Sequence, residues 1–283
     1  MRVVDASGVR IGAGERLALI AGPCVIESEA LCLEVARELA GIARRTGVGA
    51  IFKSSFLKDN RSSEQSFQGP GLRDGLRILE KVRAETGLPI LSDVHDLSDV
   101  DAACDVLDVV QIPAYLCQQT RLVRAVAERA KVVNLKKGQF LAPEDMAAAV
   151  GKVRRAGNEN ILLTERGSCF GYRNLVVDVR AIPKMHKLGV PVVMDATHAV
   201  RIYGVRSDDP AGGEPEYIET IARAGVAAGA DAVFLETHPQ PLEGLCDAMS
   251  MTRLDRLEAI VRRLVAIREA LSENDAWTPT PTS

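Results

Sequence analysis

Residues 109–135, VVQIPAYLCQQTRLVRAVAERAKVVNL, contain the unit on which the prediction of the fold rests. The β-rich run Val109–Ile112 is followed by an amphipathic segment that begins near Thr120, and a second β-rich run follows at Val132–Leu135. A strand, a helix and a further strand in this order are typical of a βα unit in a parallel sheet.

The same unit recurs along the whole chain at intervals of about 20 to 40 residues. Six further runs have the same character: Leu17–Ile20, Ala50–Lys53, Ile90–Ser92, Ile161–Leu163, Val192–Met194 and Ala232–Leu235. Several runs are continuously apolar, as expected for strands buried on both faces. Further helical patterns begin near Ser28, Gly71, Leu97, Pro143, Val176, Glu216 and Thr252. Eight alternations predict one (β/α)8 TIM barrel over residues 1–272 rather than two domains.

The two ends of the chain differ from this pattern. Residues 2–14 carry Gly8, Gly12 and Gly14 before the first strand, and they predict a short hairpin that caps the bottom of the barrel. Residues 273–283 are rich in Pro and Thr, and we expect them to be disordered.

Composition excludes several classes of function. Apolar residues make up 47% of the chain and charged residues 26%, with a net charge of −3 and no basic block. These values are typical of a soluble enzyme and argue against binding to nucleic acid. The chain has neither the roughly 20 consecutive apolar residues of a membrane span nor a signal-peptide pattern. Its six cysteines are scattered, so we expect free thiols, no membrane partner and a cytoplasmic location.

Polar side chains collect where the predicted strands end, which is where TIM barrels place their active sites. The strands lead into AGPCVIES, FKSSF, LSDVH, QIPAY, NLKKGQF, LTERG, MDATH and LETH. Three of the four histidines, His95, His198 and His238, lie in these segments. This concentration predicts an active site at the carboxyl end of the barrel.

Three cations, Lys53, Lys136 and Arg166, end the second, fifth and sixth strands. Cations that converge on one cavity repel each other unless an anion neutralises them, so they indicate a ligand with phosphate and carboxylate groups. The structural alternative is that they form ion pairs with acidic neighbours. The candidates for such pairs are Asp93, Glu165 and Asp195.

A second set of side chains combines a thiol, an imidazole and two carboxylates: Cys24, His198, Glu236 and Asp247. Such a mixed set suits a divalent ion of intermediate hardness, for example Zn²⁺, Fe²⁺ or Mn²⁺. The alternative for Cys24 is a small buried hydrophobic residue.

Eight motifs in order resemble the 3-deoxy-D-manno-octulosonate 8-phosphate synthase family. They are AGPCVIES, FKSSF, NRSS, QIPAY, NLKKGQF, ERGSCFGYRNLVVD, DATH and ETHPQP, and the resemblance covers about residues 16–272. It implies a barrel enzyme, usually a homotetramer, that joins phosphoenolpyruvate to arabinose 5-phosphate and releases phosphate. The implied setting is lipopolysaccharide biosynthesis.

The resemblance also implies roles for single residues. Cys24 stands where metal-independent members carry Asn, which implies the metal-dependent class with Mn, Fe, Zn, Co or Cd bound. The implied metal ligands are Cys24, His198, Glu236 and Asp247. The implied phosphoenolpyruvate ligands are Lys53, Ser55, Gln111, Ala114, Lys136 and Arg166. Arg61 and Ser62 are implied to hold the sugar phosphate, and Lys58, Asn60, Asp93 and His95 to act in catalysis.

Departures from the family pattern cluster around the second substrate. FLKDNRSS replaces FDKANRSS, so Leu57 and Asp59 stand in place of Asp and Ala. Gln118 stands where LCRQT-like motifs carry an arginine. AGGEPEY places Glu214 near an expected basic position, and DAMSMTRL follows the metal aspartate in place of an LPL-like pattern.

Several readings therefore stay open. Arg121 or Arg124 compensates for Gln118, or the enzyme uses another aldose, phosphorylated or not. A heptulosonate-phosphate synthase is the related second choice. A zinc-dependent phosphoester hydrolase and a non-catalytic sugar-phosphate-binding protein are the alternatives from other classes.

Overall fold

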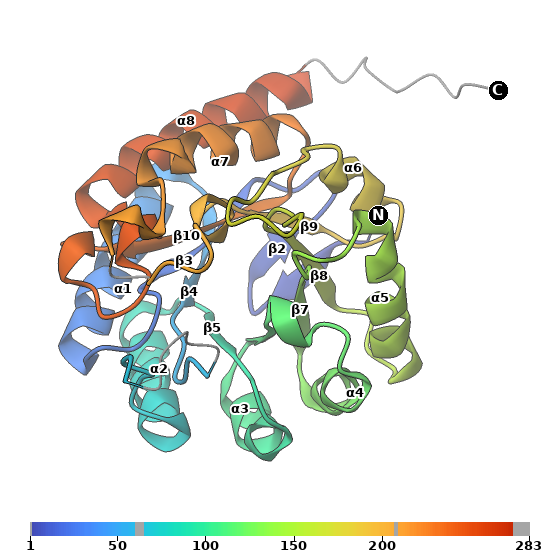
Figure 1. The fold of residues 1–283 in the computed structure, drawn as a ribbon, viewed down its shortest axis with the longest axis horizontal. Helices are drawn as coiled ribbons and strands as arrows, with labels where there is room; N and C mark the ends of the chain where they lie inside the picture. Colours follow the sequence, from blue (N-terminus) through green and yellow to red (C-terminus); the bar gives the residue numbers. More distant parts are fainter. Residues whose placement is uncertain (1, 60–64, 207–208, 274–283) are drawn as a thin grey trace.

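The computed structural model describes residues 2–59, 65–206 and 209–273. Within these residues, eight parallel strands form a closed barrel (Figure 1). The strands are β3 (Ala18–Gly22), β4 (Gly49–Lys53), β5 (Ile90–Asp93), β6 (Val109–Ile112), β7 (Val132–Lys136), β8 (Ile161–Glu165), β9 (Val192–Asp195) and β10 (Ala232–His238). Each pairs with the next, and β10 closes the barrel against β3, with Ala232 opposite Ala18. The predicted TIM barrel is confirmed.

Helices surround the strands as an outer layer. They are α1 (Glu29–Thr46), α2 (Leu72–Thr86), α3 (Val100–Val106), α4 (Thr120–Arg129), α5 (Met146–Arg155), α6 (Ala181–His186), α7 (Ile218–Ala227) and α8 (Leu254–Glu273). Helix α1 begins where the sequence predicts, because Ser28 Oγ accepts a hydrogen bond of 3.1 Å from the Leu31 amide. Across the described chain, no helix has both the length and the apolar character needed to cross a membrane.

One predicted helix start is wrong. Val176 does not begin a helix, because its backbone exchanges two hydrogen bonds of 2.9 Å with Ser168 in an antiparallel bridge, and α6 starts only at Ala181. The helix predicted to start near Thr252 is confirmed: α8 begins at Leu254, directly after β11 (Thr252–Arg253), which pairs with the end of β10.

Three other boundaries differ slightly from prediction. The segments predicted to start near Pro143 and Glu216 each begin with a 3-10 turn, Pro143–Asp145 and Pro215–Tyr217. Helix α8 continues to Glu273, one residue beyond the predicted end of the barrel. The rest of the predicted disordered tail, residues 274–283, lies outside the described residues.

The predicted hairpin is present and closes the amino end of the barrel. Strands β1 (Val4–Ala6) and β2 (Val9–Ile11) pair antiparallel, with Val4 opposite Ile11. Their inward side chains share one buried cluster with residues at the base of the barrel: Ala18, Ile51, Leu91, Val109 and Val132. The hairpin therefore fills the end of the barrel opposite to the strand-end motifs.

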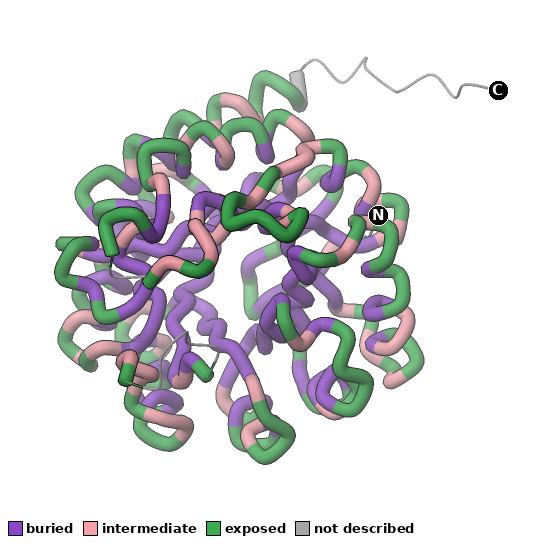
Figure 2. The backbone as a smooth tube through the Cα atoms, in the orientation of Figure 1, coloured by how far each residue is buried: buried purple, intermediate pink, exposed green. Residues whose placement is uncertain are grey.

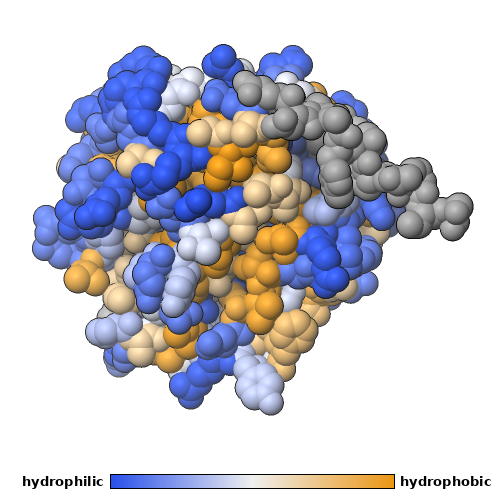
Figure 3. All heavy atoms as spheres, turned by 90° about the horizontal axis from the view of Figure 1, so that it is seen from above, coloured by the Kyte–Doolittle hydropathy of each residue, from blue (hydrophilic) through white to orange (hydrophobic). Residues whose placement is uncertain are grey.

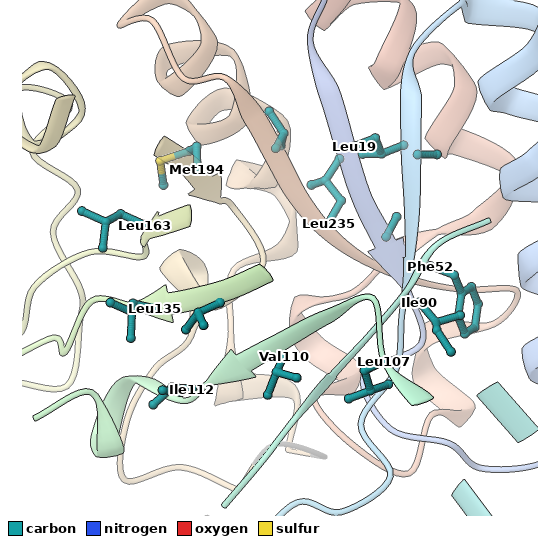
Figure 4. Packing of buried hydrophobic residues seen from close by; sticks show 14 of the residues in the cluster. Leu19, Phe52, Ile90, Leu107, Val110, Ile112, Leu135, Leu163, Met194 and Leu235 are labelled. Atoms are coloured by element: carbon teal, nitrogen blue, oxygen red, sulfur yellow. The ribbon is translucent and has the colours of Figure 1, made fainter. Parts of the chain in front are cut away.

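Alternation along each strand separates two cores. Figure 4 shows strand residues such as Phe52, Leu135 and Leu235, which belong to the core between the strands and the helices. Residues of the other parity face the barrel interior, where they are apolar near the hairpin. Toward the carboxyl end these interior positions become polar, with Lys53, Asp93, Gln111, Asn134, Lys136, Thr164, Asp195 and Glu236. Figure 2 shows the strands as a buried ring inside more exposed helices, so this polar layer lies inside the protein.

Candidate active site at the carboxyl end of the barrel

A cavity of about 490 Å³ opens at the carboxyl end of the barrel. Among its described lining residues are four cations, Lys58, Lys136, Arg166 and Arg201, and two carboxylates, Asp93 and Asp247. Gln111, Ala114, Tyr115, Tyr203, His198 and Cys246 also line it. The excess of positive charge favours an anionic ligand.

A larger cavity of about 620 Å³ lies on the side of α7 and α8, next to the turns Pro241–Glu243 and Ala248–Ser250. Figure 3, which looks down on this side, shows hydrophobic atoms between hydrophilic ones. Its lining includes Ile218, Leu242 and Met249 but none of the residues predicted to do chemistry. The convergence of charge, and not the volume, therefore identifies the candidate site.

Arg166 and Lys136 enter the site from neighbouring strands. Lys136 Nζ lies 2.7 Å from Asp195 Oδ2 and 4.3 Å from the centre of the Phe234 ring. Burial lowers the pKa of Lys136, although Asp195 opposes that shift. Arg166 is 5% exposed, and its Nε and Nη1 atoms donate to no acceptor within the described chain. A guanidinium held in this way is available for an oxyanion.

Lys53 and Lys58 lie on the side of the site formed by β4. Lys53 is fully buried and does not line the cavity, because its Nζ donates to Cys24 O at 2.8 Å and to Glu236 Oε1 at 2.7 Å. Lys58 does line the cavity, with Nζ 3.6 Å from Asp93 Oδ2 and 4.0 Å from Glu236 Oε1. Lys58 is thus the cation of this pair that can meet a ligand directly.

The structural alternative, in which the strand-end cations form ion pairs with acidic neighbours, is correct for some of these cations. Lys136 pairs with Asp195, as that alternative predicts, and Lys53 pairs with Glu236, which it does not include. Glu165 is turned away from the cavity: it lies 3.6 Å from Lys137, and its Oε1 accepts the backbone amides of residues 166 and 167. Some cations of the site are therefore paired with carboxylates, while others, above all Arg166, remain available to bind an anionic ligand.

Asp93 is the last residue of β5 and His95 follows the strand, and the two side chains occupy different environments. Burial by itself would raise the pKa of Asp93, but Lys58 and Lys53 hold it well below the usual range. Ser55 Oγ donates to Asp93 Oδ2 at 3.0 Å and Gln111 Nε2 donates to Oδ1 at 2.5 Å, so the carboxylate is ionised and oriented. Burial lowers the pKa of His95, and neither ring nitrogen has a partner among the described residues. A neutral imidazole of this kind can accept or relay a proton.

The four predicted metal ligands come together around Asp247. Its Oδ2 lies 3.5 Å from Cys24 Sγ and 3.6 Å from His198 Nε2, and His198 Nε2 lies 3.7 Å from Glu236 Oε1. The group His198, Glu236 and Asp247 offers ligand atoms within 4.8 Å of one another, and so does the group Cys24, Cys246 and Asp247. One ion of intermediate hardness suits this set of sulfur, nitrogen and oxygen atoms.

The surroundings of these side chains also fit a cation. Asp195 Oδ2 lies 2.8 Å from His198 Nδ1, which orients the ring so that Nε2 faces Glu236 and Asp247. Glu236 Oε2 is buried and has no hydrogen-bond partner among the described residues. Asp247 has a left-handed backbone, with φ 50°, an uncommon conformation that a functional site can sustain.

Two cavity residues next to Asp247 are absent from the sequence-based prediction. Arg201 Nη1 lies 2.5 Å from Asp247 Oδ1, and Cys246 Sγ lies 2.9 Å from Cys24 Sγ. The signals were weak, because Arg201 lies beyond DATH in an irregular segment and Cys246 is part of no paired motif. Tyr203, whose ring centre lies 5.6 Å from Arg166 Cζ, is a third such residue.

The remaining predicted residues have mixed outcomes. Ala114 and Gln111 line the cavity, whereas Ser55 reaches it only through its bond to Asp93. Asn60, Arg61 and Ser62 lie outside the described residues. Gln118, Arg121 and Arg124 are exposed and do not line the cavity, and neither does Glu214.

The chain is similar to one protein family and to several proteins that share one name. The model of the DAHP synthetase I family matches residues 1–273. A protein of Trichlorobacter lovleyi named 2-dehydro-3-deoxyphosphooctonate aldolase is 53% identical over 259 residues, which are 92% of this chain and 95% of that protein. Proteins of the same name from Syntrophotalea carbinolica and Geobacter sp. strain M21 are 52% and 51% identical. They are matched over 98% and 97% of their lengths and over 97% and 94% of this chain.

Proposed function

The chain belongs to the DAHP synthetase I family, and we propose that it condenses phosphoenolpyruvate with an aldose phosphate and water, arabinose 5-phosphate being the first candidate. The products are a 3-deoxy-2-ulosonate 8-phosphate and inorganic phosphate. The names of relatives about 50% identical over nearly their whole length support this reaction. They favour it over the heptulosonate-phosphate alternative.

The observation on which the proposal rests is the missing hydrogen-bond partners of the Arg166 guanidinium among the described residues. Two of its nitrogens, which have no partner among the described residues, lie beside a cavity that Lys58 and Lys136 also line. A buried guanidinium without acceptors is poorly solvated. A bound carboxylate or phosphate would provide the missing acceptors. We assign the phosphoenolpyruvate anion to Arg166 and Lys136, with Gln111 and Ala114 beside it. Lys53 supports the site from below, through Glu236 and Cys24.

The bond-forming step joins C3 of phosphoenolpyruvate to the aldehyde carbon of the sugar. C3 is a weak nucleophile, so the aldehyde must be held close and its oxygen stabilised as charge develops. Lys58, held by Asp93, is the side chain that we assign to this oxygen. Water then adds to C2 and gives one proton to a base, while the alkoxide formed from the aldehyde takes up a proton. The new hydroxyl on C2 loses its proton as the carbon–oxygen bond to phosphate breaks, which leaves the keto acid and inorganic phosphate. His95, whose two ring nitrogens are buried and have no partner among the described residues, is the base that we assign to the water proton.

We propose further that the enzyme is metal-dependent and that Cys24, His198, Glu236 and Asp247 hold the ion. When bound, a divalent cation supplies Lewis-acid polarisation of a substrate or water oxygen. Glu236 Oε2, buried without a partner in the described chain, supports this assignment. Mn, Fe, Zn, Co and Cd are all compatible with the donor set.

The aldose and the assembly complete the proposal. Gln118, Arg121 and Arg124 are all exposed and do not line the cavity, so a sugar phosphate inside the cavity would meet none of them. We propose a homotetramer in the cytoplasm that acts in lipopolysaccharide biosynthesis. Asn60, Arg61 and Ser62 remain proposed ligands of the sugar phosphate.

The decisive experiment is phosphate release from phosphoenolpyruvate by the purified protein, with and without Mn²⁺, across a panel of aldoses. Release with arabinose 5-phosphate that requires the metal supports the whole proposal. Release with another aldose alone keeps the chemistry and changes the substrate. Tight binding of phosphoenolpyruvate without turnover across the panel would contradict catalysis and favour a binding protein.

A further inference from the structure

Four fully or nearly fully buried side chains form a hydrogen-bonded row across the barrel interior, which we call the belt: Thr164, Asn134, Gln111 and Asp93. Thr164 Oγ1 donates to Asn134 Oδ1 at 2.7 Å, and Asn134 Nδ2 donates to Gln111 Oε1 at 2.9 Å. Gln111 Nε2 then donates to Asp93 Oδ1 at 2.5 Å. The belt connects β8, β7, β6 and β5, and its members at positions 93, 111 and 134 are direct strand partners.

The direction of the belt is fixed at its Asp93 end. An ionised carboxylate only accepts hydrogen bonds, so Gln111 must turn its amide nitrogen toward Asp93. The carbonyl of Gln111 then needs a donor, which Asn134 supplies, and the carbonyl of Asn134 in turn takes the hydroxyl proton of Thr164. Thr164 is able to end the row because a hydroxyl group can donate or accept. Every amide in the belt therefore has one allowed orientation.

The barrel itself does not require these polar residues. Thr164 is the strand partner of Val193, an apolar residue of the same interior cluster as Leu162. Phe234 on β10 also belongs to that cluster and packs within cation–π distance of Lys136. Buried amides cost free energy unless they are fully hydrogen-bonded, so an apolar residue would serve folding equally well. A role in the site explains why the row is polar.

Gln111, the member of the belt next to Asp93, lines the cavity. An amide nitrogen carries two hydrogens, of which Asp93 takes one. We infer that Asn134 and Thr164 are positioning residues that hold the amide of Gln111 with its second N–H, and not its carbonyl, available to the anionic ligand. This inference rests on the proposed function, since it takes that ligand to be phosphoenolpyruvate. Neither Asn134 nor Thr164 lines the cavity, so they act through Gln111.

The test measures the affinity for phosphoenolpyruvate by calorimetry, and kcat and KM by phosphate release. Thr164→Val keeps the shape and removes the donor, so we expect phosphoenolpyruvate to bind about tenfold more weakly. We expect kcat at saturating substrate to change less than threefold, and Thr164→Ser to restore the affinity. Asn134→Asp replaces the donor to the Gln111 carbonyl by a carboxylate that can only accept, so the orientation of Gln111 set by Asp93 is opposed and the loss of affinity should be larger. Should the valine variant not fold, Thr164→Ala carries the same expectation.

Thr237→Val is the matched control. Thr237 is also fully buried in a barrel strand, and its hydroxyl donates to Thr252 O at 2.9 Å, but it lies outside the belt. This variant loses a comparable hydrogen bond, so its melting temperature should fall as in Thr164→Val while its affinity for phosphoenolpyruvate stays within twofold of wild type. Equal affinities in the Thr164→Val and Thr237→Val variants would overturn the inference alone. Failure of the wild-type protein to bind phosphoenolpyruvate would overturn the proposed function and, with it, the inference.

Discussion

Replacement of Arg166 by Met should stabilise the ligand-free protein while it weakens binding of phosphoenolpyruvate. Two nitrogens of this guanidinium are buried without acceptors among the described residues. Each unmade hydrogen bond of a buried group costs about 1–3 kcal/mol. Methionine removes both donors and keeps much of the packing, and it gives up a contact with Tyr203 worth about 0.5–1 kcal/mol. The free energy of unfolding should therefore rise by about 1–5 kcal/mol.

The same substitution should have the opposite effect on binding. If both nitrogens donate to the ligand, two charge-assisted hydrogen bonds of about 1.5–3 kcal/mol each are lost. A loss of about 3 kcal/mol or more corresponds to an affinity at least roughly 100-fold weaker.

Arg201→Met is the matched control, because Arg201 lines the same cavity but is paired. Its Nη1 lies 2.5 Å from Asp247 Oδ1, and both side chains are nearly buried, 13% and 12% exposed. Removal of the arginine leaves the buried carboxylate of Asp247 without its opposite charge, which costs about 3 kcal/mol of stability in a buried pair. The two arginine variants should therefore shift the melting temperature in opposite directions.

Thermal unfolding of chelator-treated protein, with and without phosphoenolpyruvate, measures both effects. A free-energy gain of about 1–5 kcal/mol should raise the melting temperature by about 2–10 °C, at about 2 °C per kcal/mol in a chain of this length. The ligand should raise the melting temperature of wild type and have little effect on Arg166→Met. If Arg166→Met melts as far below wild type as Arg201→Met does, Arg166 is a structural partner and the reasoning fails.

Three further predictions concern the thiols and His95. Cys24→Ser should lower the bound metal and the activity together, as measured by elemental analysis and phosphate release; full activity in metal-free Cys24→Ser protein would refute the ligand assignment. Because Cys24 Sγ and Cys246 Sγ lie 2.9 Å apart, mild peroxide should link them in metal-depleted protein, and non-reducing peptide mapping should find no such link in Cys246→Ser. Burial lowers the pKa of His95 below its ordinary value, so the unfolded chain binds this proton first as pH falls. The stability that the neutral ring contributes is present above about pH 6.5 and declines below it; His95→Asn should lose less stability than wild type between pH 7.5 and 5.5, and equal losses in chemical unfolding would contradict this.

The barrel could be predicted because its signal is local and repeated. All eight strands were found within a few residues of their observed bounds, since each is a short apolar run between helical patterns. The predicted helix start at Val176 failed because this residue forms a backbone bridge with Ser168, and a helical pattern of side chains does not reveal such a pairing.

The sequence predicted which residues gather at the candidate site, but not which of them contact each other. Strand ends meet at one end of a parallel barrel, so position alone brings Lys136, Arg166 and Asp93 to one cavity. Position does not say which of them is already paired. Lys53 was grouped with Arg166, yet Lys53 is bound to Glu236 while Arg166 keeps two nitrogens without acceptors in the described chain.

By itself, the sequence determined the fold, the end of the barrel that carries the chemistry, and the side chains that gather there. These follow from the period of the hydrophobic pattern and the order of the strands, which are properties of the chain read in one direction. Tertiary structure alone decided the pairing: the belt through Asn134 and Thr164, the contact of Cys24 with Cys246, and the bond of Arg201 to Asp247. Distances of a few ångströms between residues up to 222 positions apart depend on strand register and barrel closure, and only the folded molecule sets them.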